Sequence, residues 1–100
     1  MKHPIGIFDS GIGGLTVYKA IRKHFREEDL VYFGDTARVP YGPKSPKTII
    51  EYSLQNARFL LQHQIKILVV ACNTSSSVAL PELQKITHIP IIDVIQPGAE

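Results

Sequence analysis

The single cysteine of the chain, Cys72, stands where a thiol can do chemistry. It follows the most hydrophobic stretch, residues 65–71, and precedes the polar residues Asn73, Thr74 and Ser75. A cysteine beside an apolar strand is most often a small core residue. Its position at the end of the stretch, with a helix expected directly behind it, favours a chemical role, because the positive end of a helix dipole stabilises a thiolate. Such a thiolate can act as a nucleophile or as a general base.

A second candidate is the glycine-rich turn of residues 9–14, in which Asp9 and Ser10 are followed by three glycines. Glycine lets the backbone approach a ligand, and the N–H groups that start a helix attract a phosphate or a carboxylate. The same residues also suit a plain turn before a helix, with Asp9 as an N-cap or turn former. The turn lacks a P-loop lysine, and Thr16 replaces the last glycine of the dinucleotide fingerprint.

Hydrophobic periodicity predicts the elements that position these residues. Short apolar runs predict buried strands at residues 5–8, 30–33, 65–71 and 90–95. Apolar residues at spacings of three and four predict helices at residues 15–25, 46–61 and 74–86. Ser45 is the predicted N-cap of the second helix, with Pro46 at its first position. Pro81 must lie in the first turns of the third helix or kink it.

The second of these helices has a predicted buried stripe. Its members recur at helical spacing and are Ile50, Leu54, Ala57 and Leu61.

This order, β-α-β-α-β-α-β, predicts an α/β fold in which a parallel sheet has helices on both faces, a three-layer αβα arrangement. Ligands of open parallel sheets bind beyond the carboxyl ends of the strands. The residues expected there are Asp9, Ser10, Gly34, Asp35, residues 72–75 and Gln96. The proline-rich loop of residues 36–46 is expected over the same edge, and its Tyr41 is predicted either to anchor the loop or to close over a ligand.

Composition narrows the function classes. A chain of 100 residues with 44% hydrophobic and 20% charged residues forms at most one globular domain, or part of one. The net charge is only +2, and the basic stretch of residues 19–26 is followed by three acidic residues, which predicts a solvated helix face and not a nucleic-acid-binding surface. None of the four histidines stands at metal-ligand spacing from a cysteine or carboxylate, so no metal site is predicted.

The cysteine count and the distribution of apolar residues indicate a cellular location. One cysteine excludes an internal disulfide framework and fits a reducing compartment. The start of the chain does not have the pattern of a signal peptide, and no apolar stretch reaches membrane-spanning length. A cytoplasmic protein is therefore expected.

Three segments together resemble the N-terminal signatures of glutamate racemases, in the aspartate/glutamate racemase family. They are residues 8–17 (FDSGIGGLTV), 34–42 (GDTARVPYG) and 70–75 (VACNTS). The resemblance covers nearly the whole chain in the right order and spacing. It implies a cofactor-independent isomerase that interconverts L- and D-glutamate and supplies D-glutamate for peptidoglycan in the cell wall.

The resemblance also implies roles for individual residues. Cys72 matches the first of two catalytic cysteines, the one expected to act on D-glutamate, and Asp9 matches the carboxylate that assists it. The positions that match substrate-binding residues are Asp9, Ser10, Tyr41, Gly42, Asn73 and Thr74. One thiolate removes the α-proton and the other thiol delivers a proton to the opposite face. The implied partner is glutamate, with no nucleic acid and no membrane, and an exposed sheet edge is expected to favour a homodimer.

The chain departs from the family in one respect. The family's second cysteine, with a neighbouring histidine, lies in the C-terminal half of a chain more than twice as long, and this sequence contains only Cys72. Residues 1–100 are therefore expected to be an incomplete first domain of a two-domain racemase, inactive alone. The end at Glu100, just after Pro97 and Gly98, fits the same expectation.

Three alternatives stay open. The first is a related cysteine-dependent racemase, isomerase or decarboxylase, acting for example on aspartate or hydantoins, although Asp9-Ser10 and residues 40–42 favour glutamate. The second is a phosphate- or nucleotide-binding α/β module that uses the glycine turn. The third is a non-catalytic folding or interaction fragment.

Overall fold

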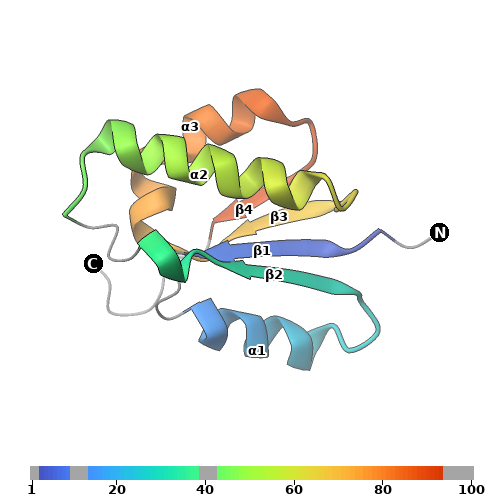
Figure 1. The fold of residues 1–100 in the computed structure, drawn as a ribbon. Coiled ribbons are helices and arrows are strands. Elements are labelled where there is room, and N and C mark those ends of the chain that lie inside the picture. Colours follow the sequence, from blue (N-terminus) through green and yellow to red (C-terminus); the bar gives the residue numbers. More distant parts are fainter. Residues whose placement is uncertain (1–2, 10–13, 39–42, 94–100) are drawn as a thin grey trace.

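The structure, a computed structural model, describes residues 3–9, 14–38 and 43–93 of the chain. Strands and α-helices alternate along the described residues (Figure 1). They are β1 Ile5–Asp9, α1 Gly14–His24, β2 Leu30–Gly34, α2 Pro46–Leu61, β3 Ile67–Val70, α3 Asn73–Ile86 and β4 Ile91–Asp93. A short 3-10 helix, η1 Thr36–Arg38, follows β2.

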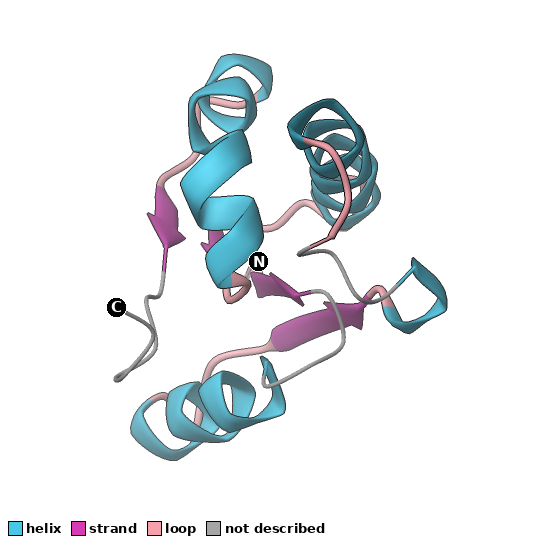
Figure 2. Cartoon of the chain, turned by 90° about the vertical axis from the view of Figure 1, so that its left-hand side faces the viewer, coloured by secondary structure: helices cyan, strands magenta, loops and turns pink. Residues whose placement is uncertain are grey.

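The strands form one parallel sheet in the order β2-β1-β3-β4. Strand β1 is paired on both sides, since Ile5 lies opposite Leu30 of β2 and Ile67 of β3. Helix α1 covers one face of the sheet, and α2 and α3 cover the other (Figures 1 and 2). The predicted three-layer αβα fold with a parallel sheet is confirmed.

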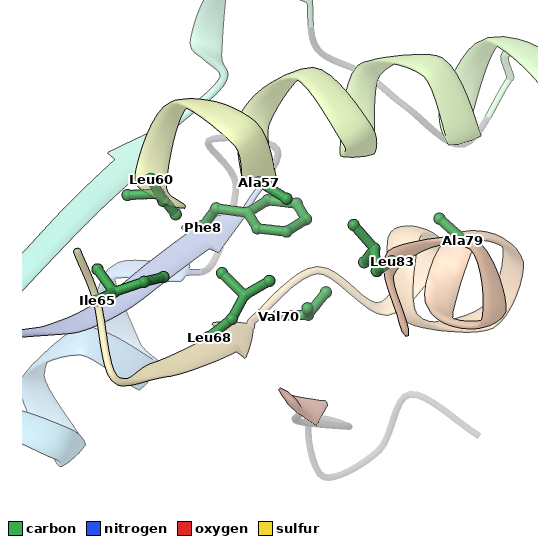
Figure 3. Close-up of a cluster of buried hydrophobic side chains, with 8 residues drawn as sticks. All are labelled: Phe8, Ala57, Leu60, Ile65, Leu68, Val70, Ala79 and Leu83. Carbon is green, nitrogen blue, oxygen red and sulfur yellow. The ribbon is translucent and has the colours of Figure 1, made fainter. Parts of the chain in front are cut away.

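Two apolar clusters fill the two faces, because successive side chains of a strand point to opposite sides. Phe8, Leu68 and Val70 meet α2 and α3, in a cluster completed by Ala57, Leu60, Ile65, Ala79 and Leu83 (Figure 3). Ile7 and Val69 belong to the cluster on the α1 side. All five residues of β1 are buried, as a strand covered on both faces requires.

The predicted start of α2 is confirmed in detail. The side-chain oxygen of Ser45 accepts a hydrogen bond from the backbone N–H of Thr48 at 3.2 Å, and Pro46 begins the helix. Proline suits this position because the N–H that it lacks would have no partner inside the helix. Pro81 lies inside α3, past the first turn.

Other boundaries differ from the predictions. Strand β3 is shorter than residues 65–71, because Gln64 turns the chain with a φ of 56° and the ordered strand starts at Ile67. The fourth strand is described as Ile91–Asp93, and the rest of its predicted span, residues 94–95, lies outside the described residues. Helix η1 was not predicted, since that segment was assigned to the proline-rich loop.

The basic stretch on α1 is an exposed helix face, as predicted, with Lys19 and Lys23 in solvent. Arg22 donates to the carbonyl oxygens of Arg26 and Glu28, at 3.2 and 2.8 Å, and so satisfies backbone acceptors after the helix ends. Of the helices that the structure describes, none is both long and apolar enough to pass through a bilayer.

The different burial of two neighbouring strands, β3 and β4, predicts that substitutions in them differ in their cost to stability. Replacing the fully buried Leu68 by alanine leaves a cavity and should lower the free energy of unfolding by about 2–5 kcal/mol. Ile92 of β4 is 49% exposed, and Ile92→Ala should cost about 1 kcal/mol or less. Urea unfolding followed by circular dichroism measures both, and equal losses would contradict the assignment of the core.

Candidate functional site

The predicted site residues of three strands meet at the carboxyl edge of the sheet. Asp9 ends β1 opposite Gly34, the last residue of β2. The backbone N–H of Asp35 donates to the carbonyl oxygen of Asp9 at 3.0 Å, and that of Ala71 donates to Phe8 at 2.9 Å. Cys72 directly follows Ala71, so Asp9, Asp35 and Cys72 come together as predicted.

Cys72 is both a buried residue and the N-cap of α3. Its side chain is 6% exposed and lies in a cluster with Ile49, beside Tyr52 and Val78. The Sγ atom accepts a hydrogen bond from the backbone N–H of Ser75 at 3.5 Å. An N–H donor at the start of a helix stabilises negative charge on the sulfur. Cys72 therefore lies at the start of α3, as its position in the sequence predicted, with a backbone N–H directed at its sulfur.

A hydroxyl pair that the sequence did not indicate holds this helix start in place. Ser53 of α2 donates from its Oγ to the Oγ of Ser75 at 2.8 Å, and both side chains are fully buried. Ser76 donates from its Oγ to the carbonyl oxygen of Val70 at 3.5 Å. The N–H group that faces the Cys72 sulfur thus belongs to a residue fixed by its own side chain.

The buried stripe of α2 explains why this pair was missed. The buried residues of the helix are Ile49, Ser53, Asn56, Ala57 and Leu60. Of the stripe predicted from apolar spacing, Ala57 is buried, and Ile50, Leu54 and Leu61 are half-buried at its side. Ser53 and Asn56 are buried but polar, so hydrophobic periodicity could not detect them. The predicted stripe was therefore rotated to one side of the face that is in fact buried.

Asp9 has a fully buried carboxylate. Its Oδ2 accepts a hydrogen bond from the hydroxyl of Tyr32 on β2 at 2.8 Å. Burial, followed by the hydrogen bond to Asp9 and the charge of that carboxylate, raises the pKa of Tyr32 from 10.0 to about 12. The phenol therefore stays a proton donor throughout the neutral range. Tyr32 was not among the predicted site residues, because a tyrosine inside an apolar strand resembles any core aromatic.

The side chains of Asp9 and Cys72 reach the edge from opposite faces of the sheet. Tyr32, the partner of Asp9, packs against the α1-side cluster that includes Ile7. Cys72 packs with Ile49 of α2 on the other face. A small ligand in contact with both groups must lie beyond the strand ends, which is where open parallel sheets bind ligands.

A polar network ties the end of β2 to α2. Arg38 donates from Nε to Asp35 Oδ2 at 2.8 Å, from Nη1 to Gln55 Oε1 at 2.6 Å and from Nη2 to Asn56 Oδ1 at 3.2 Å. Its guanidinium carbon lies 4.0 Å from the ring centroid of Tyr52. Asp35 is buried, and a buried carboxylate needs such donors to remain charged. The network fixes residues 35–38 against α2.

The remaining predicted site residues differ in how far the structure describes them. Thr74 lies half-buried in the first turn of α3, and Asn73 begins that helix. Those outside the described residues are Ser10, the glycines at positions 11 and 13, Tyr41, Gly42 and Gln96. Among residues 3–9, 14–38 and 43–93, no group of three or more histidine, cysteine, aspartate or glutamate side chains is arranged to hold a metal ion.

Comparison with known proteins identifies close relatives. Residues 5–100 match the family described as Asp/Glu/Hydantoin racemase. The glutamate racemase of Geobacter metallireducens is 62% identical over 95 residues, which are 95% of this chain and 35% of that protein. The chain therefore spans little more than a third of the length of this relative.

Solved structures of glutamate racemases are also similar to this chain. The glutamate racemase of Aquifex pyrophilus superposes with a TM-score of 0.89 at 59% identity, over 98% of this chain and 38% of that one. The Francisella tularensis glutamate racemase, solved in complex with D-glutamate, gives a TM-score of 0.89 at 48% identity, over 92% of this chain and 35% of that one.

The raised pKa of Tyr32 predicts a loss of stability at high pH. Below pH 10.0 the phenol is protonated in both the folded and the unfolded chain, and its contribution to stability is complete. As pH rises from 10.0 toward about 12, the unfolded chain loses this proton first, so the free energy of unfolding falls. Urea unfolding at several pH values across this window should show a shallower fall for Tyr32→Phe than for the wild type. Tyr18→Phe, which alters the other ring of the aromatic pair, should keep the wild-type slope; equal slopes in all three proteins would contradict the Tyr32–Asp9 interaction.

Proposed function

The chain belongs to the Asp/Glu/Hydantoin racemase family, and from this premise we propose that it is the N-terminal part of a glutamate racemase. The observation that carries the proposal is the thiol of Cys72 at the N-terminus of α3, with the N–H of Ser75 directed at its sulfur. The buried carboxylate of Asp9 at the same sheet edge supports it. The activity is the cofactor-independent interconversion of L- and D-glutamate.

The chemistry requires a base that is strong enough at neutral pH and a site that stabilises the carbanion. The α-proton of an amino acid is weakly acidic, and no electron sink is needed if donors surround the substrate carboxylate. In the proposed reaction the Cys72 thiolate removes the α-proton of D-glutamate and becomes a thiol. A second thiol then gives its proton to the opposite face of the α-carbon, which yields L-glutamate. Asp9 assists the proton transfer at Cys72.

Substrate contacts are proposed for residues at the start of α3 and for residues 9–10 and 41–42 of the sequence. The N–H groups at a helix start suit a carboxylate, and Thr74 lies in the first turn of α3. The proposed substrate-binding residues are Asp9, Ser10, Tyr41, Gly42, Asn73 and Thr74. Each of them is assigned by its match to the family's motifs.

Residues 1–100 are proposed as part of the first of two domains. The chain spans 35% of the Geobacter metallireducens relative and contains a single cysteine, so the second thiol would come from the remainder of the protein. That remainder would also shield the carbanion from water. Residues 1–100 alone should therefore not racemise glutamate. A cytoplasmic location, a role in peptidoglycan synthesis and a homodimer complete the proposal.

The alternative substrates within the family are aspartate and hydantoins, which the family description includes. The relatives named glutamate racemase favour glutamate.

The first test of the proposed function measures exchange of the α-proton of glutamate. The complete protein, incubated in heavy water with D- or L-glutamate and no added cofactor, should replace the α-proton with deuterium and invert both enantiomers. Proton NMR measures the exchange and optical rotation measures the inversion. Residues 1–100 alone, tested in parallel, should do neither. Turnover of aspartate or a hydantoin with untouched glutamate would replace the proposed substrate.

The second prediction concerns the two reactive side chains of the complete protein. Cys72→Ser should lower kcat by about 10⁴-fold, because a serine hydroxyl is far too weak an acid to serve as the base. Asp9→Asn should lower kcat by about 10²-fold. Ser77→Ala, an exposed change on the same helix as the Cys72 cap, serves as the control and should keep full activity. Wild-type turnover by Cys72→Ser would make Cys72 a core residue only.

A further inference from the structure

We propose that Tyr32 is a positioning residue for the active site: its hydroxyl holds the Asp9 carboxylate in one orientation, in space that Gly34 leaves open. This inference rests on the proposed function and deepens it. It assigns to a residue outside the three sequence motifs a part in the reaction at Cys72.

The position of Tyr32 in the sheet suits this role. Tyr32 lies opposite Ile7 on the neighbouring strand, two residues before the pair Asp9 and Gly34. Side chains two residues apart share one face of a sheet, so the ring of Tyr32 runs along that face toward the strand end. Its hydroxyl reaches Asp9 Oδ2 at 2.8 Å. The ring packs edge-on against Tyr18 of α1, with 5.5 Å between the ring centroids. The donor is therefore anchored by core packing and is not free to turn away.

Gly34 provides the space for this hydrogen bond. A Cβ atom at position 34 would lie 3.2 Å from the Tyr32 hydroxyl oxygen and 3.6 Å from Asp9 Oδ1. A contact of 3.2 Å is tighter than ordinary packing, so the hydroxyl would have to move by a few tenths of an ångström. Gly34 belongs to strand β2, where alanine can adopt the backbone conformation. An alanine at this position would thus disturb the Tyr32–Asp9 contact while preserving the strand.

The need for such a donor follows from the burial of Asp9. A carboxylate removed from water is costly to keep charged unless hydrogen-bond donors face it. The Tyr32 hydroxyl supplies such a donor, and its hydrogen bond directs Asp9 Oδ2 toward β2. Without the hydroxyl, Asp9 loses this hydrogen bond and the orientation that it fixes. Tyr32 itself lies between the sheet and α1, so its effect on catalysis passes through Asp9.

The test uses the complete protein and three variants. Tyr32→Phe removes the hydroxyl and keeps the ring, and it should lower kcat for both enantiomers about tenfold, since one hydrogen bond to a charged group is lost. The KM should stay near the wild-type value, which separates an effect on the proton-transfer step from a loss of substrate binding. Gly34→Ala should act in the same direction. Tyr18→Phe, the matched control, should leave kcat and KM unchanged.

The outcomes separate this inference from the proposed function. If the wild-type protein does not racemise glutamate, the proposed function fails and this inference fails with it. If the wild type is active and Tyr32→Phe keeps the wild-type kcat, only the positioning role is wrong. A lower kcat with a raised KM also overturns it, because a general disturbance of the site impairs substrate binding as well. Circular dichroism checks the fold of each variant, and if Tyr32→Phe is unfolded, Gly34→Ala decides by the same criteria.

Discussion

A parallel strand that is covered on both faces has no place for a charged side chain until it ends, and this constraint organises the whole chain. Strand β1 pairs with β2 and β3, and its residues before Asp9 are glycine or apolar. Polar chemistry is consequently confined to the carboxyl edge, where Asp9 and Cys72 follow adjacent strands. The apolar runs that build the core thereby also decide where polar side chains can lie.

The two helical layers divide the support of this edge between them. On one face, α2 and α3 meet through the buried hydroxyls of Ser53 and Ser75, and this contact holds the N–H that faces the Cys72 sulfur. On the other face, under α1, Tyr32 holds the carboxylate of Asp9. A proton-transfer site needs its groups in fixed directions. The side chains of Asp9 and Cys72 are thus each held by a different helical layer.

The sequence predicted those features that depend on local pattern and missed those that depend on tertiary pairing. The order of elements, the parallel sheet and the Ser45-Pro46 helix start follow from periodicity and capping rules, and the structure confirms them. Tyr32 and Ser53 were not predicted to support the site, because their partners are distant in sequence and their own neighbours are apolar. Arg38 likewise pairs with Asn56 across a loop. The motif resemblance indicated the family. The catalytic and substrate-binding roles all remain predictions, and the residues concerned are Asp9, Ser10, Tyr41, Gly42, Cys72, Asn73 and Thr74.

The strand order β2-β1-β3-β4 affects how the chain can fold while the ribosome synthesises it. Among the described strands, β1 is synthesised before both of its neighbours in the sheet, β2 and β3. One of its edges can pair as soon as β2 emerges, whereas the other must wait for β3, which follows α2. Until then β1 presents open backbone hydrogen-bonding groups along one edge, and such an edge favours wrong association of unfinished chains. The order of synthesis thus leaves an apolar strand paired on one side only until β3 has been made.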